Sequence, residues 1–241
     1  QTNILIKATE INMRKIIKSA FNIFGYEIKK KNFIEEQGFQ LHHYNKGNKS
    51  FDYNQYKKIQ IEGNKKKIDR VFVIEENIKY LSDYIIKELE QPSFGLCHGT
   101  RRGKEQEWFK KYLGFEVLGT EISDNASEFK NTIQWDFHDV KPDWVNAVDF
   151  IYSNSLDHSY NPKKCLDAWM SCLKKDGICI IEHTTEHENA SMLDPFGSHI
   201  SIMPYLILEW SNSAYYVSEI IDGPVKGDSH EYLKFLIIRN K

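Results

Sequence analysis

The sequence has no apolar run long enough to cross a membrane. A membrane-spanning helix needs about 20 consecutive apolar residues, and no stretch of the 241 residues approaches that length. No secretory signal with an apolar centre and a small-residue cleavage site is visible either. These absences argue against a membrane-spanning protein, and we expect a cytoplasmic one.

Cysteine is scarce, and its spacing is uninformative for a metal or redox site. The chain has four cysteines and no Cys-x-x-Cys pair. We therefore expect reduced, mostly buried thiols, as in proteins of a reducing compartment. The cysteines are Cys97, Cys165, Cys172 and Cys179.

The formal net charge is only −2, and this small value hides a division of the chain. Residues 1–70 carry 15 basic and 7 acidic side chains, whereas residues 71–241 carry 17 basic and 27 acidic ones. An acidic main part would repel a phosphate backbone, so we expect no nucleic-acid partner. The length suits one α/β domain, which we place at residues 76–241, with residues 1–75 as a basic extension.

Residues 8–24 place apolar side chains at helical spacing among basic ones, which predicts a helix. Gly25 follows directly, in the position where glycine commonly ends a helix. Such a helix suits peripheral membrane contact, packing in a homo-oligomer, or a lid. Residues 37–68 are polar and rich in Gly, Asn, Lys and Tyr, and we expect an irregular, partly ordered arm. Its lysines suit a small anionic acceptor such as a nucleotide-linked sugar.

From residue 76 the pattern changes to alternating helices and strands, which is typical of a mostly parallel, doubly wound sheet. An Asp176-Gly177 turn precedes the 178–182 strand. The last two strands have the spacing of a hairpin. Helices are expected at 76–90, 102–113 and 162–173, and strands at 93–97, 115–120, 148–153, 178–182, 215–221 and 233–239.

The first strand-to-helix turn contains Gly95 and Gly99 and continues with Thr100. A glycine there lets the backbone approach a ligand closely at the N-terminus of the helix. Glu121 follows Gly99 by 22 residues, at the end of the next strand, where a carboxylate can accept both hydrogen bonds of a ribose diol. Asp136 suits an exocyclic adenine amine, with Asp124 and Asp139 as alternatives, and Phe137 suits packing on the ring.

The order of these motifs resembles class I S-adenosylmethionine-dependent methyltransferases over residues 76–241. The stretches SNSLDH at 153–158 and KKDG at 174–177 resemble two further landmarks of that family. The Cys-His-Gly-Thr-Arg turn at 97–101 is similar to a subgroup from bacterial capsule and lipopolysaccharide biosynthesis clusters. The acidic residue and the further glycines of the usual turn are missing here.

The resemblance implies a Rossmann-like α/β sandwich with a late antiparallel strand. It implies S-adenosylmethionine as cofactor, S-adenosylhomocysteine as product, and a small-molecule acceptor. The most favoured reaction is methylation of a hydroxyl of a nucleotide-activated sugar in capsule biosynthesis. The implied cofactor-binding residues are Gly95, His98, Gly99, Thr100, Glu121, Ile122, Asp136, Phe137 and Asn154.

Candidates for the reacting end of the site follow the fourth and fifth strands of the expected sheet. Asp157 and His158 lie at its mouth, and His183 or His158 would accept a proton, because imidazole titrates near neutral pH. His183 and His187, with neighbouring carboxylates, also suit a metal, although we assign no metal ligand. The alternative functions are an RNA or protein methyltransferase and a non-catalytic binding module.

Overall fold

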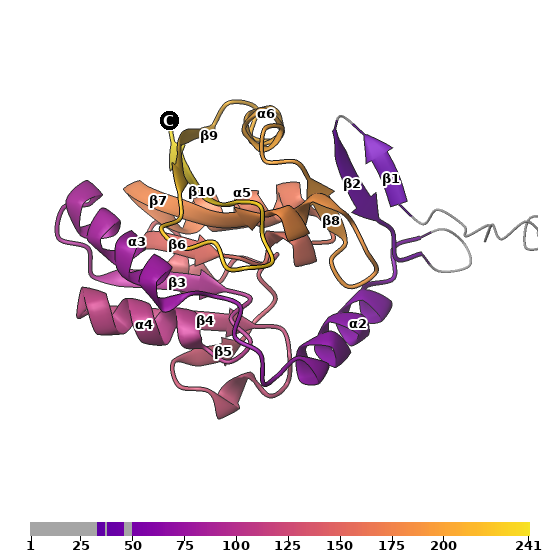
Figure 1. Cartoon of the computed structure of the whole chain (residues 1–241), viewed down its shortest axis with the longest axis horizontal. Coiled ribbons are helices and arrows are strands. Elements are labelled where there is room, and N and C mark those ends of the chain that lie inside the picture. Colours follow the sequence, from indigo (N-terminus) through magenta and orange to yellow (C-terminus); the bar gives the residue numbers. More distant parts are fainter. Residues whose placement is uncertain (1–32, 37, 46–49) are drawn as a thin grey trace, which may run out of the picture. The chain divides into compact units, whose positions relative to one another are not determined.

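The computed structural model describes residues 33–36, 38–45 and 50–241 (Figure 1). Residues 33–241 form one compact unit. The helix expected at 8–24 lies outside the described residues, and so do the membrane contact and self-association expected from it. Within the described part of the chain, no helix is long and apolar enough to span a membrane.

A seven-stranded sheet forms the centre of this unit, in the order β5-β4-β3-β6-β7-β10-β9. All neighbouring pairs from β5 to β7 are parallel, and β10 is antiparallel to both β7 and β9. This confirms the expected parallel sheet with a late reversed strand. The strands are β3 (Phe94–His98), β4 (Glu116–Glu121), β5 (Thr132–Gln134), β6 (Val148–Ser153), β7 (Leu173–Thr184), β9 (Tyr215–Asp222) and β10 (Leu233–Asn240).

Helices cover both faces of the sheet, and two apolar clusters fill the space beneath them. Helices α3 (Glu75–Glu88) and α4 (Lys104–Leu113) pack on one face (Figure 1), against residues such as Phe150. Helices α5 (Pro162–Cys172) and α6 (Met203–Trp210) contribute to the cluster on the other face. Apolar side chains on both faces explain why β6 and β7 read as almost continuous apolar runs. All four cysteines are buried and unpaired, as expected.

The expectation of an irregular arm at 37–68 is wrong. Residues 39–42 form β2 (Phe39–His42), which pairs with β1 (Phe33–Glu36) and β8 (Phe196–Ser198) in a three-stranded sheet. Residues 53–66 form the regular helix α2 (Tyr53–Lys66).

Helix α2 escapes a hydrophobicity pattern because its buried face is polar. Asp52 caps its N-terminus by accepting a hydrogen bond from the Gln55 amide. Tyr56, Gln60 and Asn64 are buried at intervals of four residues, so they share one face of the helix. Tyr56 and Gln60 bind other segments through side-chain hydrogen bonds, which an apolar periodicity cannot reveal.

Short 3-10 helices connect the strands near the carboxyl ends of β6 and β7. They are η3 (Leu156–His158) and η4 (Thr185–Glu188), while η1 (Ala126–Glu128) and η2 (Pro142–Trp144) lie in earlier loops. The expected Asp176-Gly177 turn is a bulge within β7 instead. The pairing passes from Val148↔Leu173 to Phe150↔Ile178, so extra residues of β7 stand out from the ladder.

Candidate functional site

The turn between β3 and α4 requires glycine at position 99. Gly99 has φ +75°, and a Cβ atom there would lie 2.6 Å from the Ser155 Cβ. The amides of Gly99 and Thr100 both donate to the Thr120 carbonyl, at 2.9 and 3.1 Å. The turn is therefore held by the end of β4 and lies directly against the loop that follows β6.

Glu121 closes this arrangement from the end of β4. One carboxylate oxygen accepts the Arg101 amide and the other accepts the Ser123 amide, each at 3.0 Å. Burial raises the pKa of Glu121, although both backbone hydrogen bonds act in the opposite direction. The side chain thus links the glycine turn to the loop after β4 and keeps acceptor capacity in a buried place.

Asp136, just beyond β5, is held by two tightly bound donors. Tyr53 Oη donates to Oδ2 at 2.7 Å, and His138 Nδ1 lies 2.7 Å from Oδ1. Burial alone would raise the pKa of Asp136, but the hydrogen bonds from His138 and Tyr53 outweigh it and lower the pKa to about 2. Tyr53 belongs to α2, so this helix forms part of the site. Sequence reasoning missed it, having taken 37–68 for an arm.

Two adjoining cavities open at the carboxyl ends of the parallel strands, where ligands bind in sheets of this kind. The first, here called the β4–β5 cavity, encloses about 540 Å³, solvent included, and its wall is completed by α2. Its other lining residues include Glu121, Ile122, Asp136 and Phe137. The second, the β6–β7 cavity, encloses about 850 Å³ and is lined by Thr100, Asn154, Asp157, Glu182 and others.

The two cavities lie next to each other and share part of their walls. The common residues come from α2's end, the glycine turn and the loop after β6. They are Lys67, Gly99, Arg101, Ser155 and His158.

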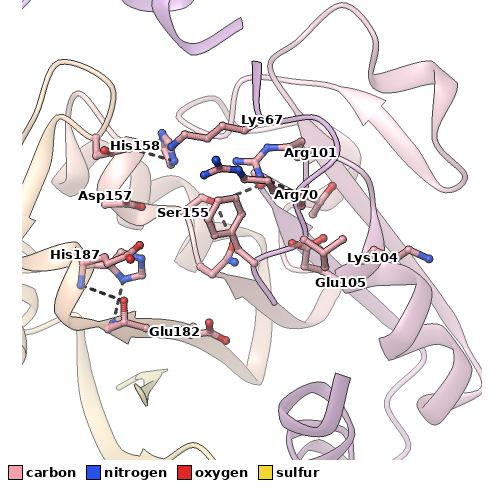
Figure 2. Close-up of a pocket in the computed structure, with 18 of the residues that line it drawn as sticks. Lys67, Arg70, Arg101, Lys104, Glu105, Ser155, Asp157, His158, Glu182 and His187 are labelled. Carbon is pink, nitrogen blue, oxygen red and sulfur yellow. Dashed lines mark hydrogen bonds and ion pairs between the residues drawn. The ribbon is translucent and has the colours of Figure 1, made fainter. Parts of the chain in front are cut away.

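The β6–β7 cavity is lined by two buried carboxylates to which the sequence analysis assigned no role. Burial raises the pKa of Glu105 to about 8 and that of Glu182 to about 7. Tyr152 Oη donates to Glu182 Oε2 at 2.7 Å, whereas Glu105 Oε2 has no hydrogen-bond partner among the described residues. Figure 2 shows Glu105 across the cavity from Asp157 and His158. Glu182 could have been noticed in the sequence as the one acidic residue of the apolar run 178–182.

Basic side chains from two segments line the same cavity. Arg101 lies over the Phe72 ring at 4.7 Å, and Arg102 donates to the Asp69 carbonyl at 3.2 Å. These contacts orient the guanidinium groups at the cavity. The basic residues of the lining are Lys67, Arg70, Arg101, Arg102 and Lys104.

Three of the residues assigned to the site from the sequence line neither cavity, and neither do Asp124 and Asp139, the alternatives to Asp136. Gly95 allows close packing, because a Cβ there would lie 2.1 Å from the Phe150 ring. His98 is buried, stacks on Trp169 and contacts Thr120 Oγ1 through Nδ1 at 2.8 Å, and burial lowers its pKa to about 3.

His183 is the third. Its Nε2 hydrogen-bonds the Ser198 carbonyl at 3.0 Å, and its Nδ1 lies 3.2 Å from Tyr232 Oη. Burial, reinforced by the neighbouring His187, lowers the pKa of His183 to about 3. Both ring nitrogens are thus engaged within the protein, on the face of β7 opposite Glu182. His187, by contrast, lines the β6–β7 cavity.

Comparison with known proteins supports this architecture. A family model described as "Methyltransferase domain" matches residues 96–181, less than half of the chain. The structure resembles 1,6-didemethyltoxoflavin-N1-methyltransferase of Burkholderia thailandensis, with TM-score 0.60 and 12% identity over 86% of this chain and 97% of that one. No curated protein sequence matches significantly.

Two further solved structures are similar. The plantazolicin methyltransferase BpumL gives TM-score 0.57 and 14% identity, over 78% of this chain and 98% of that one. The mitomycin 7-O-methyltransferase MmcR gives TM-score 0.52 and 12% identity over 69% of this chain, which spans only 54% of that protein's length.

The chain has the class I methyltransferase fold. Within the methyltransferase fold, the reversed strand β10 between β7 and β9 matches the late reversed pair that the resemblance implies. The turn at Gly99 occupies the first strand-to-helix connection of the sheet. Glu121 is the last residue of β4, and Asp136 lies just after β5. The three residues that carried the sequence resemblance therefore meet around one cavity.

Proposed function

We propose that the protein transfers a methyl group from S-adenosylmethionine to a small molecule. One observation carries the proposal: the Gly99 turn, Glu121 and Asp136 line one cavity, which shares wall residues with a second cavity that Glu105 and Glu182 line. The names of the similar structures support it, since they describe methyltransferases of toxoflavin precursors, plantazolicin and mitomycin. Two of them were solved with S-adenosylhomocysteine.

The polar atoms left without a partner fit such a cofactor. Asn64 Oδ1 in the β4–β5 cavity is a buried acceptor without a partner among the described residues, as is Glu105 Oε2 in the β6–β7 cavity. Unsatisfied buried acceptors are costly, so a ligand that brings donors is favoured. S-adenosylmethionine brings ribose hydroxyls, an adenine amine and an ammonium group.

Each part of the cofactor has a suitable set of residues. Glu121 would accept the ribose hydroxyls, and Asp136 with Phe137 would recognise the adenine. The amino-acid end would enter the β6–β7 cavity past Gly99. Glu105 would accept the ammonium there, replacing the acidic residue that this chain lacks before its glycine turn.

The reaction needs a proton acceptor as well as alignment. The cofactor supplies an electrophilic methyl group on a sulfonium. With both substrates bound, the acceptor oxygen would form a bond to the methyl carbon while the carbon–sulfur bond breaks and its electron pair returns to sulfur. The hydroxyl proton passes to Glu182, whose pKa of about 7 suits a general base. Asp157 and His158 line the same cavity and would lie beside a bound acceptor.

The acceptor that suits this cavity best is a nucleotide-activated sugar for surface polysaccharide, methylated on oxygen. Its diphosphate would bind the basic lining at Lys67, Arg70 and Arg101, since guanidinium and ammonium groups form charge-assisted hydrogen bonds with phosphate. These cations are few and surround a pocket, which suits a small anion better than an extended polyanion.

Calorimetry with S-adenosylhomocysteine tests the cofactor, and a methyl-transfer assay over a panel of nucleotide sugars tests the acceptor. Mass spectrometry should detect a gain of one methylene in one member of the panel. Absence of S-adenosylhomocysteine binding at millimolar ligand would leave only a non-catalytic module. Methylation of RNA or protein instead of a small molecule would overturn the acceptor class.

A further inference from the structure

Three side chains converge on one point in the wall of the β6–β7 cavity. Asp157, His158 and Asp194 each offer a ligand atom there, and these atoms all lie within 4.8 Å of one another. His158 Nε2 and Asp194 Oδ1 are 3.6 Å apart. Two atoms bound to the same metal ion at about 2.1 Å each would be separated by a similar distance.

The histidine is oriented as a ligand. His158 Nδ1 lies 3.1 Å from the Leu193 carbonyl and 2.9 Å from Gln60 Oε1. A backbone carbonyl can only accept, so Nδ1 carries the proton and donates it. In the neutral ring Nε2 then has the free lone pair. Metal-binding histidines are typically oriented by a hydrogen bond of this kind from the other ring nitrogen.

The two carboxylates complete the set. Asp194 Oδ2 accepts the Ser191 hydroxyl at 3.0 Å, which leaves Oδ1 directed toward His158. Asp157 is only 8% exposed, and its Oδ1 has no hydrogen-bond partner within the described ranges. A buried carboxylate oxygen without a partner is costly unless a cation lies beside it.

We propose that Asp157, His158 and Asp194 bind a divalent metal ion. One ion at this point would contact all three side chains, including Asp157, whose Oδ1 has no partner among the described residues. One imidazole nitrogen and two carboxylate oxygens suit Mn²⁺ or Zn²⁺. With three protein ligands, the ion keeps coordination positions open toward the cavity.

The role of such an ion in catalysis rests on the proposed function, but its binding does not. An open position would hold the acceptor hydroxyl and lower its pKa. The oxygen would then lose its proton to Glu182 and form its bond to the methyl carbon as the carbon–sulfur bond breaks.

Binding of Mn²⁺ to the full chain tests the site directly. Electron paramagnetic resonance of free Mn²⁺ should report one bound ion per chain. Asp194→Asn should weaken binding at least tenfold, and Asp194 is sufficiently exposed for this substitution to leave the fold intact. Asp143→Asn is the matched control, because Asp143 is an exposed aspartate paired with Lys141. It should bind Mn²⁺ as tightly as the unaltered chain.

The outcomes separate this inference from the proposed function. Absence of Mn²⁺ binding, or equal binding by Asp194→Asn and the unaltered chain, overturns the metal site. S-adenosylhomocysteine binding, measured on the same samples after chelation, judges the cofactor independently. Circular dichroism of Asp194→Asn checks that lost Mn²⁺ binding reflects the missing ligand and an intact fold.

Discussion

Glu182 and His183 are neighbours on β7, and their side chains point to opposite faces of the sheet. Glu182 reaches the β6–β7 cavity, whereas His183 binds the Ser198 carbonyl on the other side. Successive strand residues alternate in this way. Of these two neighbours only the carboxylate lines the cavity, one position before the histidine that the sequence favoured.

Replacing Glu182 by Gln should abolish the proposed base. A general base contributes about 100-fold or more, so turnover at pH 8 should fall by about that factor. In the unaltered chain turnover should rise with pH as Glu182 loses its proton near pH 7. Glu105 faces the same cavity and titrates near pH 8, so the profile is measured with Glu105→Gln as well.

Two further variants make the Glu182 test specific. Glu186→Gln alters another acid of the same cavity and should leave turnover nearly unchanged. Tyr152→Phe removes the hydrogen bond that lowers the pKa of Glu182, so the midpoint of the pH profile should move upward. An unmoved midpoint would assign the titration to another group.

Replacing Glu105 by Gln should stabilise the fold at alkaline pH and weaken binding of the cofactor. Burial raises the pKa of Glu105 from 4.5 in the unfolded chain to about 8. The native state therefore holds this proton more tightly than the unfolded chain does. The stability that the bound proton contributes is lost as the pH rises from about 4.5 toward 8. The variant should melt several degrees higher than the unaltered chain at pH 9 and almost equally at pH 4. Its affinity for S-adenosylhomocysteine should fall, because residues that lower stability at a functional site commonly contribute to ligand binding.

Replacing Glu121 by Gln should weaken S-adenosylhomocysteine binding. Hydrogen bonds to a charged group contribute about 1.5–3 kcal/mol, which corresponds to about 10- to 100-fold in affinity. Titration calorimetry measures the change. Glu116→Gln, at the exposed start of the same strand, is the control and should bind normally. Equal affinity of Glu121→Gln and the unaltered chain would refute the ribose assignment.

Replacing Gly99 by Ala should cost much more than the same change at Gly114. Both glycines have φ near +75°, but a Cβ at position 99 meets Ser155 at 2.6 Å, whereas one at position 114 meets nothing within 4 Å. Gly114→Ala should therefore lose only about 1 kcal/mol from the backbone conformation. Gly99→Ala should add a packing penalty and lose ligand binding, as measured by thermal unfolding and calorimetry. Similar losses at both positions would show that the contact with Ser155 is unimportant.

Replacing Lys67 by Ala should raise the KM for a nucleotide sugar by about tenfold, since a charge-assisted hydrogen bond to phosphate is lost. The turnover number should change little, because Lys67 would bind the acceptor without taking part in the reaction. Lys58→Ala removes a lysine of helix α2, which ends just before Lys67. The Lys58 side chain is 75% exposed, and this substitution should have no effect. A matching rise in KM for Lys58→Ala would indicate a general charge effect.

The sheet, its order of elements and the acidic strand ends could be predicted, because apolar runs and punctuating glycines mark them in the sequence. Helix α2 could not, because the residues that bury it, such as Tyr56 and Gln60, are polar. The face of the sheet to which the Glu182 side chain points could not be predicted either. Strand β7 is buried on both faces, so its apolar run carries no alternation that fixes the phase of the side chains. Asp194 lies far along the chain from Asp157, and only the folded structure brings them together.

The attachment of α2 has a consequence for how the protein becomes active after synthesis. Gln60 joins two distant segments, since its side chain binds His158, 98 residues away, and the Leu193 carbonyl, 133 residues away. Contacts between such distant parts of a chain form slowly, because a long loop must close before they contribute. The central strands can pair before this helix docks. Competence to bind ligand should therefore appear later in refolding than the circular dichroism signal of the sheet.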